Sequence, residues 1–173
     1  IAVTANVATR QTRAGELSMW KGCATAAAAK AGLFAAQLAR AGMTGPTAAF
    51  EGRHGLCEQV TGPFQLEGRG GADRPFAIER TNFKFFAAEY HAQAPLAIAL
   101  RLRGRVRPEE IEALDVWIYA MAHSEIGSEP AKWDPQTRET ADHSLPYMLA
   151  VALVDGRLTP DSFTPKRFLD PGL

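Results

Sequence analysis

The chain has 173 residues, of which 46% are hydrophobic and 22% charged, an ordinary composition for a globular protein. Its 19 basic and 19 acidic side chains cancel, so no net charge draws the chain to nucleic acid or to an anionic membrane. No apolar run reaches the ~20 residues that a membrane span needs. We therefore expect no nucleic-acid partner and no membrane partner.

The two cysteines, Cys23 and Cys57, lie far apart and form no CxxC or CxxH pair. A structural zinc site is therefore not expected. Two reduced thiols are the simpler interpretation, and a single disulfide is the alternative. No signal peptide is visible, so we expect a cytoplasmic protein.

The N-terminal third of the chain is predicted to be helical. Residues 1–10 resemble the middle of a helix without a start methionine, so we expect the chain to be a fragment of a longer polypeptide. Ser18 is a predicted cap for a helix over residues 19–40, which Gly42 and Pro46 end. Alanine dominates this helix, and small side chains all round predict close packing in a helical bundle.

The next residues change in character. Residues 47–59 mix turn and short-helix signals, and residues 60–71 are rich in glycine and proline, as in a surface connection. Residues 76–86 are aromatic and β-favouring, which predicts a strand. Residues 90–103 predict a helix with an apolar face, formed by Leu96, Ala99 and Leu100.

The C-terminal third repeats this alternation. A helix start is predicted at 108–112, a strand at 114–121, from its alternating pattern, and a polar loop over 127–140. The last helix covers 144–156, with Ser144 as its cap, Pro146 in its first turn and Gly156 as its stop. The order predicts an α+β protein: the end of an all-helical region, then an α+β layer with an incomplete sheet.

The first candidate for chemistry is Lys21, between a tryptophan and a glycine at the start of the alanine helix. A cation in the first turn opposes the helix dipole. Its side chain could simply reach out to water. The functional alternative is an ammonium that binds a carboxylate at the mouth of a cleft.

The second candidate is Lys84, which lies between aromatic residues in the predicted strand of residues 76–86. An edge-strand lysine that discourages aggregation is the structural interpretation. A second cation aimed into a polar site is the functional one. His91 follows closely as a potential acid or base, although a histidine there also suits the start of a helix.

The third candidate is the junction at residues 137–147, which gathers Arg138, Asp142, His143 and Tyr147. Asp142 or Ser144 can cap the following helix, which explains both without a catalytic role. Tyr147 and His143 lie one turn apart, and a phenol there can donate a hydrogen bond to an oxyanion. No nucleotide-binding loop, nucleophile elbow or metal-binding motif occurs, and no metal site is expected.

Four stretches in collinear order carry a resemblance that spans nearly the whole chain. They are RQTRAGELSMWKGCA at 10–24, FEGRHGL at 50–56, FKFFAAEYHAQ at 83–93 and KWDPQTRETADHSLPY at 132–147. Together they resemble the MmgE/PrpD family, which includes 2-methylcitrate dehydratase, cis-aconitate decarboxylase and iminodisuccinate epimerase.

The resemblance implies a domain arrangement. Family members have a large all-helical domain and a smaller, two-layer α+β lid domain. Residues 1–60 would correspond to the last helices of the first helical part, 61–75 to a linker and 76–173 to the first part of the lid. Two upstream active-site histidines of the family would have no counterpart here.

The resemblance also implies site residues. Lys21, Lys84 and Tyr147 match the family's catalytic lysines and tyrosine, and His91, Arg138 and His143 are weaker candidates for substrate binding. Two lysines would clamp a di- or tricarboxylate while a base removes the proton α to a carboxylate, without metal or organic cofactor.

We therefore expect a hydro-lyase fragment resembling 2-methylcitrate dehydratase. The chain would form a homodimer or associate with the missing part of the polypeptide. The alternatives are another family activity, decarboxylation or epimerisation, and a truncated, non-catalytic chain that binds carboxylates or a partner.

Overall fold

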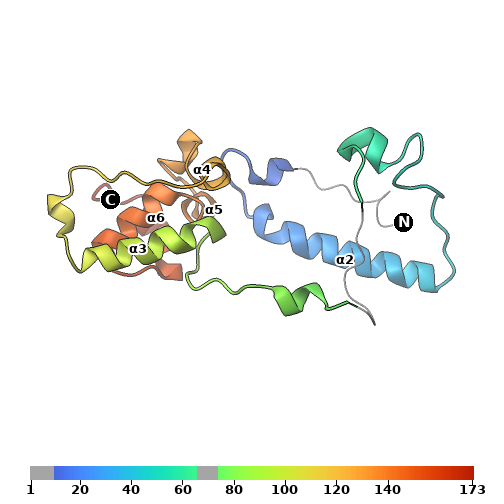
Figure 1. Ribbon diagram of the computed structural model, residues 1–173, viewed down its shortest axis with the longest axis horizontal. Coiled ribbons are helices and arrows are strands. Elements are labelled where there is room, and N and C mark those ends of the chain that lie inside the picture. Colours follow the sequence, from blue (N-terminus) through green and yellow to red (C-terminus); the bar gives the residue numbers. More distant parts are fainter. Residues whose placement is uncertain (1–9, 66–73) are drawn as a thin grey trace. The chain divides into compact units, whose positions relative to one another are not determined.

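The computed structural model describes residues 10–65 and 74–173 (Figure 1). The chain divides into two compact units, the first made of Ile1–Thr12 and Gly22–Asn82, the second of Arg13–Lys21 and Phe83–Leu173. The domain boundaries predicted from the sequence remain a prediction. The helix expected at residues 1–10 lies outside the described residues, except for Arg10, where a short 3-10 turn begins.

The alanine-rich helix α2 runs over Trp20–Arg40, one residue shorter than predicted. It ends as expected, because Gly42 takes a positive φ of 91°. The N–H of Gly42 donates to the Ala39 carbonyl and that of Met43 to the Leu38 carbonyl, both at 3.0 Å. This pair of hydrogen bonds satisfies carbonyl groups in the last turn of the helix.

The burial predicted for α2 is wrong for the structure as described. Among its residues only Ala35 is buried, and the large side chains Leu33 and Phe34 are exposed. Small residues permit close approach, but they bury a helix only where a partner helix covers them.

The rest of the first unit is a chain of turns. A tight turn at residues 48–57 includes Gly52 and Gly55, where a Cβ would lie 2.6 Å from a backbone oxygen. A π-helical turn follows at Cys57–Thr61, and a 3-10 turn at Ala77–Arg80. Both cysteines are free thiols, as expected.

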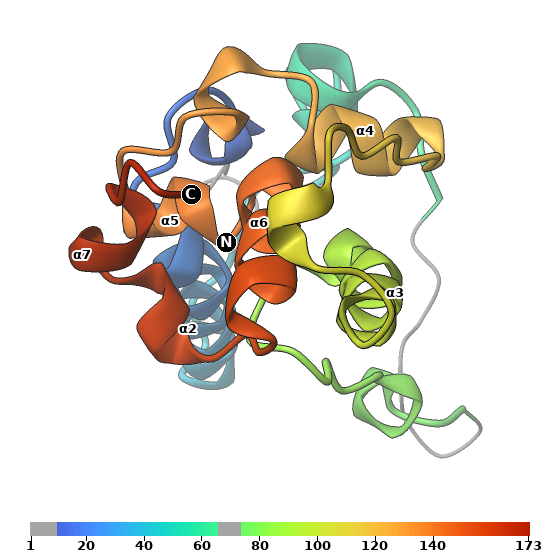
Figure 2. The ribbon, with the colours of Figure 1, turned by 90° about the vertical axis from the view of Figure 1, so that its left-hand side faces the viewer.

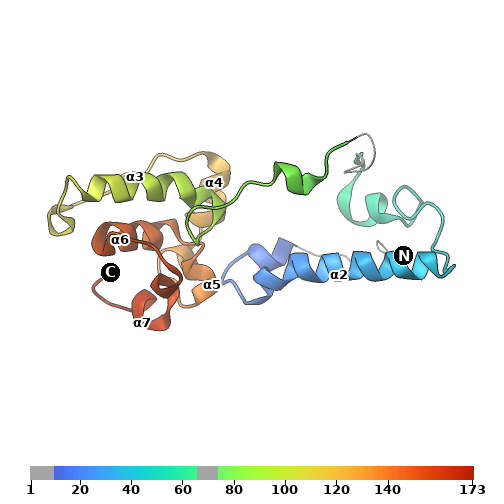
Figure 3. The ribbon, with the colours of Figure 1, turned by 90° about the horizontal axis from the view of Figure 1, so that it is seen from below.

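The core of the second unit lies between two helices, α3 (Gln93–Arg103) and α6 (Leu145–Asp155), which pack side by side (Figures 2 and 3). Seven of the eleven residues of α6 are buried, as expected for a helix that is apolar on all sides. From α3, Leu96 and Ala99 pack into this core, which confirms the predicted apolar face.

The two helices run in the same direction. At their beginnings the Glu89 N–H donates to the Asp142 carbonyl, at 3.1 Å. At their ends the Arg103 guanidinium donates to the carbonyls of Leu153 (2.9 Å) and Val154 (3.2 Å). A cation at this position also complements the negative end of the α6 dipole.

The ends of α6 are as predicted. The Ser144 hydroxyl accepts from the Tyr147 N–H, at 3.1 Å, Pro146 lies in the first turn, and Gly156 closes the helix with a φ of 69°. Three shorter helices complete the unit, α4 (Ala120–Ile126), α5 (Arg138–Ala141) and α7 (Pro165–Phe168). Short 3-10 turns connect them, at Tyr90–Ala92, Pro108–Glu110, Pro130–Lys132 and Pro160–Phe163.

The predicted α+β class is wrong: the described residues form helices and turns, with no β-strand among them. Residues 76–86 instead form the 3-10 turn and an irregular segment in which Phe83 is 97% exposed. Residues 114–119 are irregular, and α4 takes up the end of the second predicted strand. A β-favouring pattern makes a strand only when a second strand bonds to its backbone, and within the described chain neither segment finds one.

Candidate active site

The chain just before α2 is held in place by contacts within the second unit. Both carboxylate oxygens of Glu129 accept from the Gly15 N–H, at 3.1 and 3.2 Å. Leu17 is buried, and its N–H donates to the Thr140 hydroxyl at 3.0 Å. Its carbonyl accepts from the Thr137 hydroxyl at 3.1 Å. Four backbone and side-chain bonds therefore fix where α2 begins.

This docking delivers Lys21 to the junction between α5 and α6. Its ammonium donates to a carboxylate oxygen of Asp142 at 2.5 Å and to the Glu139 carbonyl at 3.0 Å. It also lies 3.0 Å from Nδ1 of His143. Only 10% of the Lys21 side chain is exposed. Lys21 is therefore not a lysine that reaches out to water.

The junction itself is built by two helix caps. The Thr137 hydroxyl accepts from the Thr140 N–H and begins α5. The Ser144 hydroxyl begins α6 and donates in turn to the Lys132 carbonyl. Only two residues, Asp142 and His143, lie between the end of α5 and the cap of α6. The caps thus turn both side chains toward Lys21.

The charges in this cluster support one another. Burial opposes ionisation of Asp142, but hydrogen bonds from His143 and Lys21 outweigh it and hold the pKa of Asp142 below its usual value. Nδ1 of His143 lies 2.5 Å from the same carboxylate oxygen that Lys21 contacts. Because that oxygen is an acceptor, we assign the proton to Nδ1, which leaves Nε2 as the nitrogen with a free lone pair. An oriented imidazole with a free lone pair can act as a base.

Two of the residues singled out in the sequence therefore come together, Lys21 and His143, with Asp142 between them. Asp142 had been noted only as a potential helix cap. Its position directly before a histidine was the available signal. Arg138 is the first residue of α5 and is exposed.

Lys84 lies in the irregular segment before α3, and its side chain is exposed. The following loop is fixed by Gln93, whose side-chain oxygen accepts from the Phe86 N–H at 2.9 Å. The amide of Gln93 donates to the carbonyls of Phe86 and Glu89, both at 3.2 Å. Since the Glu89 N–H bonds to the Asp142 carbonyl, this loop is tied to the Lys21 cluster through its backbone.

Tyr147 is directed elsewhere. It is buried on α6, and its hydroxyl donates to the Ser162 carbonyl. Burial raises the pKa of Tyr147 to about 12. Its phenol is therefore a hydrogen-bond donor rather than an anion at neutral pH, and in this structure a core carbonyl already takes that bond.

His91 makes a third arrangement, separate from the other two. Its Nδ1 contacts the Tyr119 hydroxyl, and its backbone N–H donates to a Glu89 carboxylate oxygen at 2.5 Å. Glu89 thereby caps the 3-10 turn that leads into α3. This is the structural role that a histidine at a helix start suggests.

Sequence reasoning missed one residue, Lys132. Its side chain is 1% exposed, and its ammonium nitrogen has no hydrogen-bond partner among the described residues. Burial lowers the pKa of Lys132. The negative charge of Glu129 opposes this shift, and the positive charge of Lys21 adds to it. Lys132 opens the fourth of the stretches that carry the family resemblance, so its place in that stretch was the only signal in the sequence.

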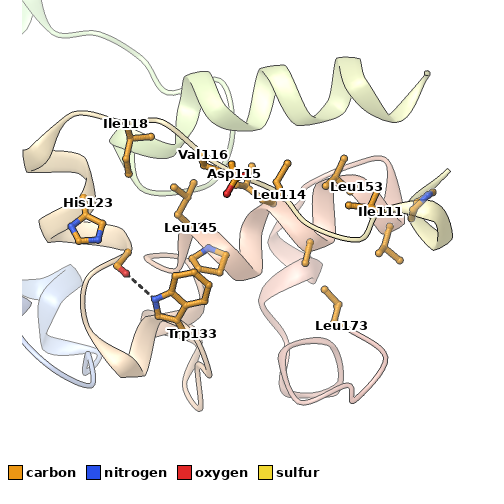
Figure 4. Close-up of a pocket in the computed structure, with 16 residues that line it drawn as sticks. Ile111, Leu114, Asp115, Val116, Ile118, His123, Trp133, Leu145, Leu153 and Leu173 are labelled. Atoms are coloured by element: carbon orange, nitrogen blue, oxygen red, sulfur yellow. Dashed lines mark hydrogen bonds between the residues drawn. The ribbon is translucent and has the colours of Figure 1, made fainter. Parts of the chain in front are cut away.

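A separate, apolar cavity of about 650 Å³ lies against α6 (Figure 4). The extended segment of residues 111–118 forms one wall, and Leu145 and Leu153 of α6 lie opposite. Trp133 also lines the cavity, with its indole N–H bonded to the Gly127 carbonyl at 2.8 Å. Lys21, Asp142 and His143 do not line it, so the apolar cavity and the charged cluster are different features.

No cluster of potential metal ligands occurs in the part of the chain that the structure describes. Within the same residues, no helix combines the length and the apolar character of a membrane span. A comparison with solved structures gives no match.

Family models match both parts of the chain. The MmgE/PrpD N-terminal domain matches residues 1–69, and the MmgE/PrpD C-terminal domain matches residues 86–173. The two matches follow each other in chain order and leave only the residues between them unmatched. The chain belongs to the MmgE/PrpD family.

Proposed function

We propose that this chain supplies part of the active site of a carboxylate lyase, with the dehydration of 2-methylcitrate as its reaction. The observation that carries the proposal is the Lys21 ammonium, held at 10% exposure against Asp142 and beside His143. A nearly buried cation next to an oriented imidazole suits the removal of a proton α to a carboxylate. Family membership supports the same class of reaction.

Each group has a distinct role in this proposal. Lys21 neutralises the negative charge that develops on the substrate carboxylate when the α proton leaves. Asp142 holds His143 with its Nδ1 proton inward, so that Nε2 accepts the substrate proton. A substrate carboxylate reaches Lys21 by replacing the Glu139 carbonyl, the uncharged one of its two acceptors.

Lys84 and Tyr147 keep the roles that the resemblance implies, as parts of the proposal. Lys84 is the second cation. It lies five residues before Glu89, whose N–H donates to the Asp142 carbonyl. Tyr147 is the acid that assists loss of the hydroxyl group, which requires its phenol to leave the Ser162 carbonyl. The proposed reaction uses no metal or organic cofactor, and the proposed protein is cytoplasmic and a homodimer.

The test is the dehydration of 2-methylcitrate, followed by the ultraviolet absorbance of the unsaturated product. Lys21→Met should lower kcat about 100-fold or more, because one preorganised donor to a developing charge contributes that much. Lys30→Met, at an exposed position of the same helix, is the matched control and should leave kcat unchanged. Equal rates for Lys21→Met and the unaltered chain would exclude the assignment. Product analysis separates dehydration from decarboxylation and epimerisation.

A second candidate is carboxylate binding without turnover. The commitment of the Tyr147 hydroxyl to a buried carbonyl favours it, since this phenol is the acid that the proposed reaction requires. Thermal stabilisation of the chain by 2-methylcitrate, with no absorbance change, is the expected result for this candidate.

A further inference from the structure

Lys132 is the buried charge that the proposed reaction leaves unused. It lies at the end of the 3-10 turn η6 (Pro130–Lys132), which packs against both α5 and α6. Its side chain is 1% exposed. A Glu129 carboxylate oxygen lies 3.8 Å from its nitrogen, too far for a hydrogen bond. Three N–H donors therefore lie inside the protein without an acceptor among the described residues.

A buried ammonium without hydrogen bonds is costly, so a lysine at such a site tends to release its proton. The charges that act on Lys132 come from Glu129, Lys21, Glu125 and Asp142. Of these, only Lys21 is a cation, and Lys21 already has two acceptors for its own N–H groups, the Asp142 carboxylate and the Glu139 carbonyl. Burial and the missing hydrogen bonds at Lys132 therefore favour its neutral amine more than they do at Lys21.

The remaining charges nearby do not compensate Lys132. On α5, Arg138 is exposed and Glu139 only partly buried, and on α6 the single charged residue is Asp155, at the far end of the helix. With Lys132 neutral, the cluster has one cation, Lys21, against three carboxylates. A proton on Lys132 would bring this balance closer to neutral and would offset part of the charge that a carboxylate adds when it binds at Lys21.

We propose that Lys132 is a positioning residue that takes up a proton when a carboxylate binds at Lys21, so that binding and protonation are coupled. The inference rests on the proposed carboxylate site. The buffer acid loses one proton, the amine nitrogen of Lys132 gains it, and the added positive charge offsets the negative charge of the ligand. Lys132 acts through the charge of the cluster, without touching the ligand.

Calorimetric titration with tricarballylate tests this directly, because this tricarboxylate has no hydroxyl group to lose. Titrations in two buffers of different ionisation enthalpy, at a series of pH values from neutral up to the usual lysine pKa of about 10.4, measure the protons taken up on binding. The unaltered chain should take up a substantial fraction of one proton in that range. His143→Gln should retain this uptake, which separates Lys132 from the other basic group of the cluster.

Two substitutions of Lys132 sharpen the test. Lys132→Arg keeps a permanent cation, so it should bind tricarballylate without proton uptake. Lys132→Met has no charge to gain, so it should bind about 10-fold more weakly, also without uptake. If Lys132→Arg does not fold, Lys132→Met alone still shows whether Lys132 is the group that takes up the proton.

The outcomes are distinct. Binding with the same proton uptake in the unaltered chain and in Lys132→Met overturns the role of Lys132 and leaves the carboxylate site intact. Binding without any uptake in the unaltered chain does the same. No binding of tricarballylate to the unaltered chain overturns the carboxylate site itself, and with it this inference.

Discussion

Helices α2 and α6 end by the same local rule, yet only α6 is part of a core. Both end at a glycine with positive φ, Gly42 and Gly156. Both are rich in apolar residues. In α6, however, seven residues are buried, whereas in α2 only Ala35 is. The signals that define a helix are local in the sequence, but burial depends on the elements that pack against it.

The difference lies in the size and the partners of the side chains. Leucine, valine and methionine on α6 face Leu96 and the small residues Ala92 and Ala99, which allow the two helices to approach closely. Alanine on α2 offers little apolar area, so few contacts arise even where a neighbour is near. The charged cluster follows the same division, because Lys21, the residue of α2 that joins it, lies in the first turn of that helix.

The largest expected effect compares matched leucine-to-alanine changes in the two helical regions. Leu96→Ala, at a position with no exposed area, should lower the free energy of unfolding of the second unit by about 2–5 kcal/mol. Leu33→Ala, at a position that is 65% exposed, should change stability by less than about 0.5 kcal/mol. Amide hydrogen exchange across α6 and α2 reports each effect in its own region.

Equal losses of protection for the two variants would show that α2 has a covered face that the exposure of Leu33 does not reveal. A loss in both helices for Leu96→Ala alone would show that the two units unfold as one.

The second effect is a gain in stability. Lys132→Met removes a buried, unpartnered amine and replaces it with an apolar chain of similar length, which should stabilise the second unit by about 1–4 kcal/mol at neutral pH. Thermal unfolding measures this gain. A purely structural lysine would lose stability on the same change, so lower stability of the variant contradicts our view of this site.

The sign of the pH dependence provides an internal control. Burial lowers the pKa of Lys132 in the folded state, so between that pKa and about 10.4 the unfolded chain binds more protons than the folded chain. Stability of the unaltered protein should therefore rise with pH across this window. The advantage of Lys132→Met should shrink as the pH rises.

The third effect compares the two helix-ending glycines. Gly156→Ala should cost about 1–2 kcal/mol for its left-handed backbone, and more because the new Cβ would lie 2.9 Å from Nε of Arg103. At Gly42 nothing lies within 4 Å of the same Cβ, so only the backbone term applies. Chemical denaturation should rank the two variants in this order, and an equal cost would mean that Arg103 moves aside freely.

Local sequence signals predicted the helices well and the strands badly. Ser144, Pro146 and Gly156 define α6 by contacts within a few residues, and the structure confirms them. The aromatic pattern of residues 76–86 predicted a strand, but pairing needs a second segment that no local pattern specifies. The cluster shows the same limit: Lys21 and His143 were recognisable, whereas their contact spans more than a hundred residues and the burial of Lys132 depends on the whole unit.

The smallest expected effect concerns Asp142, which belongs to the second unit alone. Its pKa lies below the usual value in the folded state, so its contribution to stability is present above about pH 4 and is lost as the pH falls through the folded pKa. Asp142→Asn keeps an acceptor for Lys21 but removes the charge, so stability at neutral pH should fall by about 1 kcal/mol. The free energy of unfolding of this variant should also depend less steeply on pH in the acid range.

Hydrogen exchange in α2 beyond its first turn should be the same in Asp142→Asn and the unaltered chain at each pH, since the described hydrogen bonds of Asp142 reach α2 only at Lys21. An acid limb as steep as that of the unaltered chain would mean that another carboxylate dominates there. Glu129 is then the group to replace next, because it binds the Gly15 N–H and lies beside Lys132. Acid unfolding of Glu129→Gln, compared with that of Asp142→Asn, would show which of the two carboxylates causes the loss of stability at low pH.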